Sequence, residues 1–162
     1  VKNNYQSSNQ NVFALGDCID LEQLTPVAIA QARQWTDMMY TKNKFHVSFN
    51  IIPTAIFSLP EAASVGVSEY DAKKRSKQIS IKKLSFNPLS SALTDYHKEP
   101  ILMKIIMDGH DEKIVGIHIV GEGAAEIIQA LSISVQKGIT KRDLDLTMAL
   151  HPTITEELVT IY

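Results

Sequence analysis

The sequence has very little cysteine, because Cys18 is the only one among 162 residues. A single thiol excludes an internal disulfide and any metal site built from several cysteines, and it suits a reducing compartment such as the cytoplasm. Cys18 follows the turn at Gly16 and Asp17. Because it has no second cysteine to pair with, we interpret it as an inert, small apolar side chain.

Long apolar runs and a strong net charge are missing as well. No apolar stretch approaches the roughly 18 residues that span a bilayer, so we expect no membrane association. The opening "VKNNYQSSNQ" lacks the basic start and apolar core of a secretory signal. The formal net charge of −2 gives no reason to expect nucleic acid as a partner. A hydrophobic content of 44% and a charged content of 21% are typical of a globular protein with a real core.

A complete dinucleotide-binding fingerprint is also absent. The segment "VGIHIVGEGAAEII" leads from a strand through Gly121 and Gly123 into a helix, but Glu126 replaces the third glycine. Glu122 would add negative charge where a pyrophosphate needs free N–H groups. We therefore predict no nucleotide site there. We predict no metal site, because the spacing of four histidines does not match that of metal ligands. They are His46, His97, His110 and His118.

Periodic patterning indicates an α+β fold, an antiparallel sheet with helices packed on one face. The predicted strands span residues 11–17, 54–57, 79–86, 101–107 and 114–120. The predicted helices span residues 24–40, 68–77 and 124–137, with short ones after Thr140 and from Thr153. Thr25 and Ser68 are placed as N-caps, and Gly138 ends the third helix. The turn at Asp108-Gly109 predicts a hairpin between the last two strands.

Two regions differ in character. Residues 1–48 hold too little structure for a domain, whereas residues 49–162 contain the whole α+β pattern. The helix at 124–137 carries an apolar stripe of Ile127, Leu131 and Val135 that further apolar residues broaden. Because one sheet offers too little cover for such a helix, we expect a subunit interface.

The segment "LHPTITEELVTIY", residues 150–162, supports two interpretations. Thr153 and Glu156 have the spacing of a capping box, in which the carboxylate bonds a backbone N–H and nothing more. Alternatively, the chain folds back at Pro152 so that Glu156 orients His151 for acid–base chemistry. Residue chemistry alone leaves the second interpretation open.

Five segments, in order, resemble the C-terminal portion of the glutathione-disulfide reductases, which are pyridine nucleotide–disulfide oxidoreductases. They are "VFALGD", "LTPVAIAQAR", "IPTAIFS", "VGIHIVGEG" and "HPTITEELVT". The resemblance covers nearly the whole chain, and "LTP" and "HPTxxEELV" are its specific elements. It implies that residues 1–48 are a remnant of an FAD-binding domain and residues 49–162 a dimerisation domain.

The resemblance also implies cofactor-binding residues. Asp17, after Gly16, corresponds to the aspartate that hydrogen-bonds the ribityl chain of FAD. Leu24, Thr25 and Pro26 correspond to the helix start that touches the flavin from its partly positive end.

The resemblance implies a substrate site as well. His151 corresponds to the general acid that protonates the departing glutathione thiolate, and Glu156 to its partner. Arg33 and Glu157 correspond to residues that bind glutathione disulfide. The His151-Pro152 peptide would be cis, and the histidine would serve the other subunit of a homodimer.

Several parts of such an enzyme are missing from this sequence. It has no G-x-G-x-x-G segment for FAD, no NADPH domain and no pair of redox cysteines. We expect the chain alone to be inactive and to bind neither FAD nor NADPH stably. A related reductase of trypanothione or dihydrolipoamide and a non-catalytic dimerisation module are the alternatives. Arg33 favours a carboxylated peptide such as glutathione.

Overall fold

The computed structural model describes residues 1–41, 47–91 and 99–161, so His46 and His97 lie outside the described residues. The chain divides into two compact units, Val1–Phe49 and Asn50–Tyr162, which are described separately below. Within the described residues, no helix combines the length and the apolar character needed to cross a bilayer.

The first unit is built around helix α1 (Thr25–Tyr40) and the short 3-10 helix η1 (Gly16–Cys18). Val27 and Gln31 of α1 are buried, and the Gln31 side chain accepts a hydrogen bond from the backbone of η1. Trp35 packs between aromatic neighbours, with ring centroids 5.3 Å from Phe13 and 6.0 Å from Tyr40. Side chains of α1 therefore hold this unit together.

Two predictions for the first unit are wrong. Residues 11–17 are not a strand, since only Phe13 forms an isolated bridge, to Gln6. Among the described residues of this unit no neighbouring strand offers a ladder of hydrogen bonds, and an isolated strand is not stable. Thr25 is the first helical residue rather than the N-cap, because the Leu24 carbonyl already accepts bonds from the backbone of α1.

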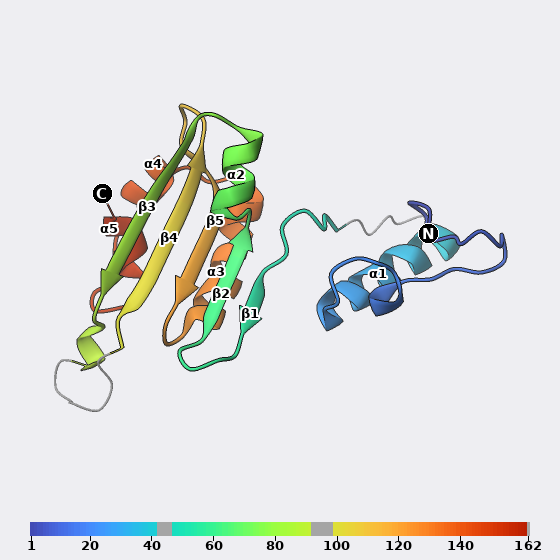
Figure 1. Ribbon diagram of the computed structural model, residues 1–162, viewed down its shortest axis with the longest axis horizontal. Coiled ribbons are helices and arrows are strands. Elements are labelled where there is room, and N and C mark those ends of the chain that lie inside the picture. Colours follow the sequence, from blue (N-terminus) through green and yellow to red (C-terminus); the bar gives the residue numbers. More distant parts are fainter. Residues whose placement is uncertain (42–46, 92–98, 162) are drawn as a thin grey trace. The chain divides into compact units, whose positions relative to one another are not determined.

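The second unit is a five-stranded antiparallel sheet with the strand order β1-β2-β5-β4-β3 (Figure 1). Its strands are β1 (Thr54–Ile56), β2 (Ala62–Gly66), β3 (Ile79–Phe86), β4 (Ile101–Asp108) and β5 (Lys113–Val120). Its helices are α2 (Glu69–Arg75), α3 (Ala124–Lys137), α4 (Lys141–Asp145) and α5 (Glu156–Thr160), with a 3-10 turn η2 (Leu89–Ser91). The predicted hairpin is the β4–β5 pair.

The core lies between the sheet and α3. Side chains alternate along a strand, so Met103 and Ile105 of β4 share a face with Ile117 and Ile119 of β5, and all four are buried. Helices α3, α4 and α5 lie behind the sheet in Figure 1, whereas the short α2 lies near one end of the other face. The predicted α+β class, with an antiparallel sheet and helices packed against it, is confirmed.

Helix α3 has the predicted bounds and ends at Gly138, whose φ of +74° suits glycine. Ile128 and Val135 are buried against the sheet, and Leu131 packs at the margin of the core. Ile133 remains 64% exposed. The sheet therefore covers one side of this helix and leaves Ile133 uncovered, so the expected subunit interface at this helix stays a prediction.

Strand β2 was not among the predicted strands. Its sequence, "AASVG", is short and made largely of small residues, which have low strand propensity. Its pairing with β1 and β5 on either side specifies it instead. At Gly66, where φ is +84°, an added Cβ would lie 2.1 Å from the Val115 carbonyl oxygen. Close backbone approach thus requires glycine at this strand end.

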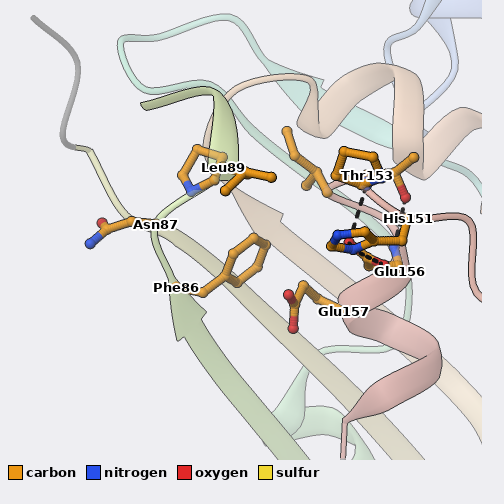
Figure 2. Close-up of a pocket in the computed structure, with 10 residues that line it drawn as sticks. Phe86, Asn87, Leu89, His151, Thr153, Glu156 and Glu157 are labelled. Atoms are coloured by element: carbon orange, nitrogen blue, oxygen red, sulfur yellow. Dashed lines mark hydrogen bonds and ion pairs between the residues drawn. The ribbon is translucent and has the colours of Figure 1, made fainter. Parts of the chain in front are cut away.

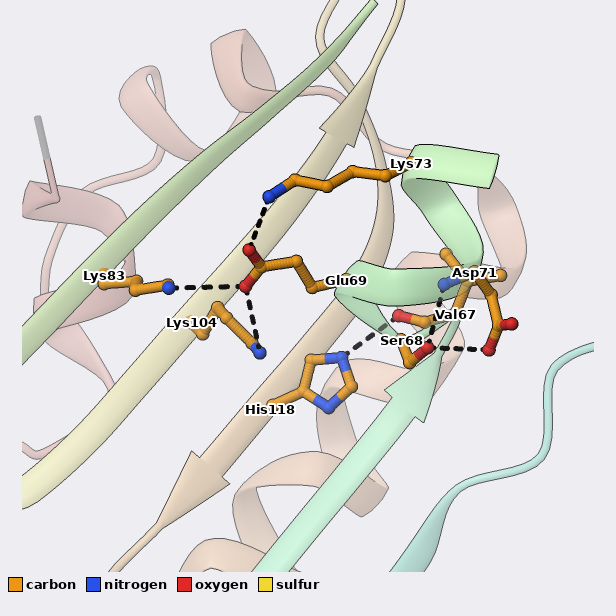
Figure 3. Close-up of polar contacts among 8 residues, drawn as sticks. All are labelled: Val67, Ser68, Glu69, Asp71, Lys73, Lys83, Lys104 and His118. Atoms are coloured by element: carbon orange, nitrogen blue, oxygen red, sulfur yellow. Dashed lines mark hydrogen bonds and ion pairs between the residues drawn. The ribbon is translucent and has the colours of Figure 1, made fainter. Parts of the chain in front are cut away.

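The sheet face opposite α3 carries a charged cluster around Glu69, the first residue of α2 (Figure 3). The Glu69 carboxylate lies 2.7 Å from Lys73 Nζ, 3.3 Å from Lys83 Nζ and 3.5 Å from Lys104 Nζ. Hydrogen bonds from Lys73 and Lys83 lower the pKa of Glu69 to about 2. The cluster therefore joins α2 to strands β3 and β4.

His118 lies beside this cluster and ties β5 to the start of α2. Its Nε2 lies 3.0 Å from the carbonyl oxygen of Val67, just ahead of α2. Burial is the largest cause that lowers the pKa of His118. The neutral ring therefore donates its Nε2–H to that carbonyl. Ser68 caps α2 by accepting from the Asp71 N–H, as predicted.

Replacing Glu69 with glutamine should remove an acid-sensitive contribution to stability. A carboxylate whose pKa falls from 4.5 to about 2 on folding stabilises the folded state fully above pH 4.5. That contribution disappears as the pH falls toward 2. Urea midpoints measured across this range should differ between wild type and E69Q at neutral pH and converge in acid. The exposed Glu122, changed to glutamine, is the control; equal pH profiles for all three proteins would contradict this assignment.

Candidate functional site

His151 precedes α5, and its peptide bond to Pro152 is cis. Its Nδ1 lies 3.0 Å from Glu156 Oε1 and 3.1 Å from Oε2. An ionised carboxylate only accepts hydrogen bonds, so Nδ1–H donates and Nε2 is left for exchange with another molecule. The His151 side chain is 76% exposed and that of Glu156 only 14%. The pair thus presents a fixed imidazole at the surface.

The same carboxylate also caps the turn that leads into α5. The Thr153 N–H donates to Glu156 Oε1 at 3.1 Å, and the Glu156 N–H donates to Thr153 Oγ1 at 3.2 Å. These are the reciprocal bonds of a capping box. The Thr153 hydroxyl also donates to the Leu150 carbonyl at 2.8 Å. The capping bonds and the His151 contact therefore coexist.

The α-helix itself begins at Glu156, so the predicted start at Thr153 is wrong by three residues. The first backbone bonds, from Glu157 to Ile154 and from Leu158 to Thr155, span three residues instead of four. Such tight turns are common where helices begin.

The hydrophobic core fixes α5 in place. Leu158 is 1% exposed and Ile161 is 4% exposed, and both belong to the core cluster beneath the sheet. Ile154 and Val159 pack against that cluster. The orientation of His151 consequently depends on burial of the residues that follow it.

A pocket of about 680 Å³ lies next to this pair (Figure 2). His151 and Glu156 stand on one side, and the end of β3 with η2 forms the other. Its lining residues are Phe86, Asn87, Pro88, Leu89, His151, Pro152, Thr153, Ile154, Glu156 and Glu157. The pocket thus combines an exposed imidazole, the Glu157 carboxylate and an apolar wall.

The wall formed by residues 86–89 was missed in the sequence. Phe86 ends a strand and Pro88 follows it, which indicates a turn but no chemistry. These residues reach the site because β3 pairs with β4 at the sheet edge and α5 packs beneath the sheet. These segments lie more than 60 residues apart in the sequence, and no local pattern predicts that they are close in the fold.

A second group of predicted residues lies in the first unit. Gly16 is buried with φ +73°, and an added Cβ would lie 3.2 Å from Ala28 Cβ, so the turn packs closely on α1. Asp17 is exposed beside it. Thr25 and Pro26, both exposed, begin α1, with Leu24 half-buried ahead of them.

As the sequence resemblance implies, these residues could contact the sugar-alcohol part of a flavin cofactor. The Asp17 carboxylate can accept bonds from ribityl hydroxyls, and the closely packed Gly16 turn gives it a fixed support. The start of α1 carries a partial positive charge suited to an electron-rich group.

Arg33 is exposed on α1 in the first unit, whereas Glu157 lines the pocket of the second. The structure therefore brings together His151, Glu156 and Glu157, and places Arg33 in the other unit. Cys18 is exposed rather than packed as a small apolar residue, and its thiol donates to the Leu15 carbonyl at 3.0 Å.

The fold of the second unit and the match of its sequence to a family model together define the class of this domain. Residues 52–162 match the family model described as "Pyridine nucleotide-disulphide oxidoreductase, dimerisation domain". The chain belongs to this family, which confirms the resemblance seen in the sequence.

Similar proteins include three glutathione reductases. That of Debaryomyces hansenii is 42% identical over 96% of this chain and 34% of its own length. That of a Nostoc species is 40% identical over the same shares. The Schizosaccharomyces pombe protein is 36% identical over 99% of this chain and 36% of its own length. The chain therefore spans about a third of the relatives it matches, at their C-terminal end.

Thr153→Ala should destabilise the turn that holds Glu156. The variant loses the bond from the Glu156 N–H and the bond to the Leu150 carbonyl, and loss of a capping side chain costs about 1 kcal/mol. Thr155 makes no side-chain capping bond, so T155A should change stability by less than about 0.5 kcal/mol. Chemical denaturation measures both; equal losses would show that the capping box contributes nothing specific.

Proposed function

We propose that this chain is the C-terminal part of an NADPH-dependent, FAD-containing reductase of glutathione disulfide. The similar proteins are named glutathione reductases, which supports this assignment. Residues 1–48 would then be the end of an FAD-binding domain and residues 49–162 the dimerisation domain. The division of the chain near residue 49 is compatible with that arrangement.

The observation that carries the proposal is the bond between His151 Nδ1 and Glu156. When Nδ1–H of a His151 imidazolium is bonded to Glu156, its second proton, on Nε2, remains available to another molecule. Imidazole and thiol groups have ordinary pKa values of about 6.5 and 8.5, so a thiolate takes a proton from an imidazolium readily. The products are a thiol and a neutral imidazole. Glu156 supports the charged ring before the transfer and fixes its tautomer throughout.

The Glu157 carboxylate and the Arg33 guanidinium together suit a zwitterionic peptide. Glu157, half-buried at the pocket, would attract the ammonium group of a glutathione moiety. Arg33 would bind one of its carboxylates in the assembled enzyme, since a guanidinium pairs with a carboxylate through two parallel bonds. A neutral dithiol tail would use neither residue.

FAD, when bound, would pass electrons from NADPH toward the disulfide. Asp17 would bind the ribityl hydroxyls, with Gly16 holding the turn. Leu24, Thr25 and Pro26 would lie against the flavin at the start of α1. With Cys18 as its only cysteine, this chain has no redox disulfide of its own, so alone it should not turn over NADPH.

A homodimer would complete the site. Leu146, Met148 and Leu150 are 74%, 93% and 73% exposed in the segment that leads into His151. Several exposed apolar side chains gathered in one short segment mark an association surface. A second copy covering this segment would bring His151 to the redox centre of its partner.

His151→Gln should lower kcat for glutathione disulfide in the complete reductase about 10²- to 10⁴-fold, the usual contribution of a general acid. Glutamine retains a donor toward Glu156 but has no titrating proton. Reduction of the bound flavin by NADPH, followed by absorbance, should be unchanged because no thiolate leaves in that step.

The matched control is His110→Gln, since His110 is exposed at the β4–β5 turn. Its kcat should equal that of wild type. If the kcat of H151Q equals that of wild type, the acid role is refuted and a non-catalytic dimerisation module is favoured.

Met148→Glu should weaken the homodimer by placing a charge on an apolar surface that association would bury. Analytical ultracentrifugation of this chain should show a dissociation constant raised at least about tenfold. Tyr70→Glu is the control, because Tyr70 is 68% exposed on α2, at the sheet face opposite α3. Unchanged association of M148E, or an equal effect of Y70E, would remove the segment before His151 from the interface.

A further inference from the structure

Gln31 stands out in the first unit because it is polar, yet only 1% exposed. It lies on the face of α1 that also presents Val27 and Ala28. Its Oε1 accepts a hydrogen bond of 2.6 Å from the backbone N–H of Gly16. The side chain thus joins two segments that are 15 residues apart.

The Gly16 N–H has no acceptor within η1, because the first N–H groups of a helix have no preceding helical carbonyl to bond. Gly16 is buried, so water does not replace the missing carbonyl. The Gly16 carbonyl is also occupied, since it accepts from the Ile19 N–H at 3.1 Å. Gln31 therefore satisfies the buried N–H of Gly16 in this turn.

The geometry of Gly16 determines where Asp17 points. Gly16 has φ +73°, and a Cβ there would lie 3.2 Å from Ala28 Cβ. Its N–H, bonded by Gln31, fixes the turn against α1 from the other side. Asp17, the next residue, is exposed and directed by that turn.

We propose that Gln31 is a positioning residue for FAD: its bond to the Gly16 N–H holds the turn from which Asp17 binds the ribityl hydroxyls. This inference rests on the proposed function. Gln31 itself touches no cofactor. Because the turn already fixes Asp17, less conformational freedom of this segment is lost when FAD binds.

The test uses Gln31→Met, which keeps the length and apolar volume of the side chain but lacks the amide oxygen. Gln34→Met is the matched control on the same helix. The Gln34 Oε1 is buried and makes no hydrogen bond within the described residues. The first measurement is amide hydrogen exchange of this chain by NMR, which needs no FAD.

In the first measurement, Q31M should lower protection of the Gly16 amide at least about tenfold, the loss expected when a buried N–H loses its acceptor. Protection of the Trp35 and Met38 amides in α1 should stay unchanged, which shows that the helix of the first unit is intact. Q34M should leave Gly16 protected. Unchanged Gly16 protection in Q31M would overturn the proposal.

The second measurement is the FAD dissociation constant of the complete reductase, from quenching of flavin fluorescence on adding FAD to the apoenzyme. Q31M should raise it about tenfold, and saturating FAD should restore kcat. Q34M should match wild type. If wild type retains FAD and Q31M binds it equally tightly, Gln31 is only structural and the proposed function stands. If the wild-type enzyme binds no FAD, the proposed function fails and this inference with it.

Discussion

One carboxylate, that of Glu156, holds together the turn on which the candidate site depends. It accepts from the Thr153 N–H and from His151 Nδ1, so the backbone bond and the side-chain bond constrain each other. A free histidine would sample several rotamers at the surface. With Glu156 in place, the ring keeps one tautomer and one orientation, and the core residue Leu158 keeps Glu156 in place. The same carboxylate thus caps the turn and orients the imidazole ring of His151.

Because side chains alternate along its strands, the sheet has one apolar face and one charged face. Met103 and Ile105 point to the helices and build the core, whereas Lys104 between them points to the charged face. The pocket forms where the edge strand β3 ends, at Phe86, and meets the turn that precedes α5. The antiparallel architecture therefore places the candidate site at an edge of the sheet, where a second molecule can reach it.

Most of the fold could be predicted from the sequence because local signals were strong. The strand at 79–86 and the helix at 124–137 have the predicted bounds, since alternation and an ending glycine mark them. Strand β2 was missed because Ala62 and Ala63 carry no strand signal, and only pairing with β5 specifies it. The false strand at 11–17 shows the converse: apolar residues without a neighbouring strand do not form one.

The candidate site was predictable only where its residues are close in sequence. The pair of His151 and Glu156 follows from a turn at proline and a cap spacing. The pocket wall at Phe86 and the bond from Gly16 to Gln31 join distant segments, and no local pattern encodes them. Tertiary packing creates these contacts.

The charged cluster at Glu69 has a consequence for the conditions under which α2 stays docked. Three ammonium groups surround one carboxylate at a partly exposed surface, where dissolved ions screen attraction over about 8–10 Å. The opposite face is held by burial of apolar area, which simple salts at moderate concentration affect little. The two faces of the sheet therefore respond differently to salt. Higher ionic strength weakens the attachment of α2 to the charged face. The apolar core between the sheet and α3 is little affected.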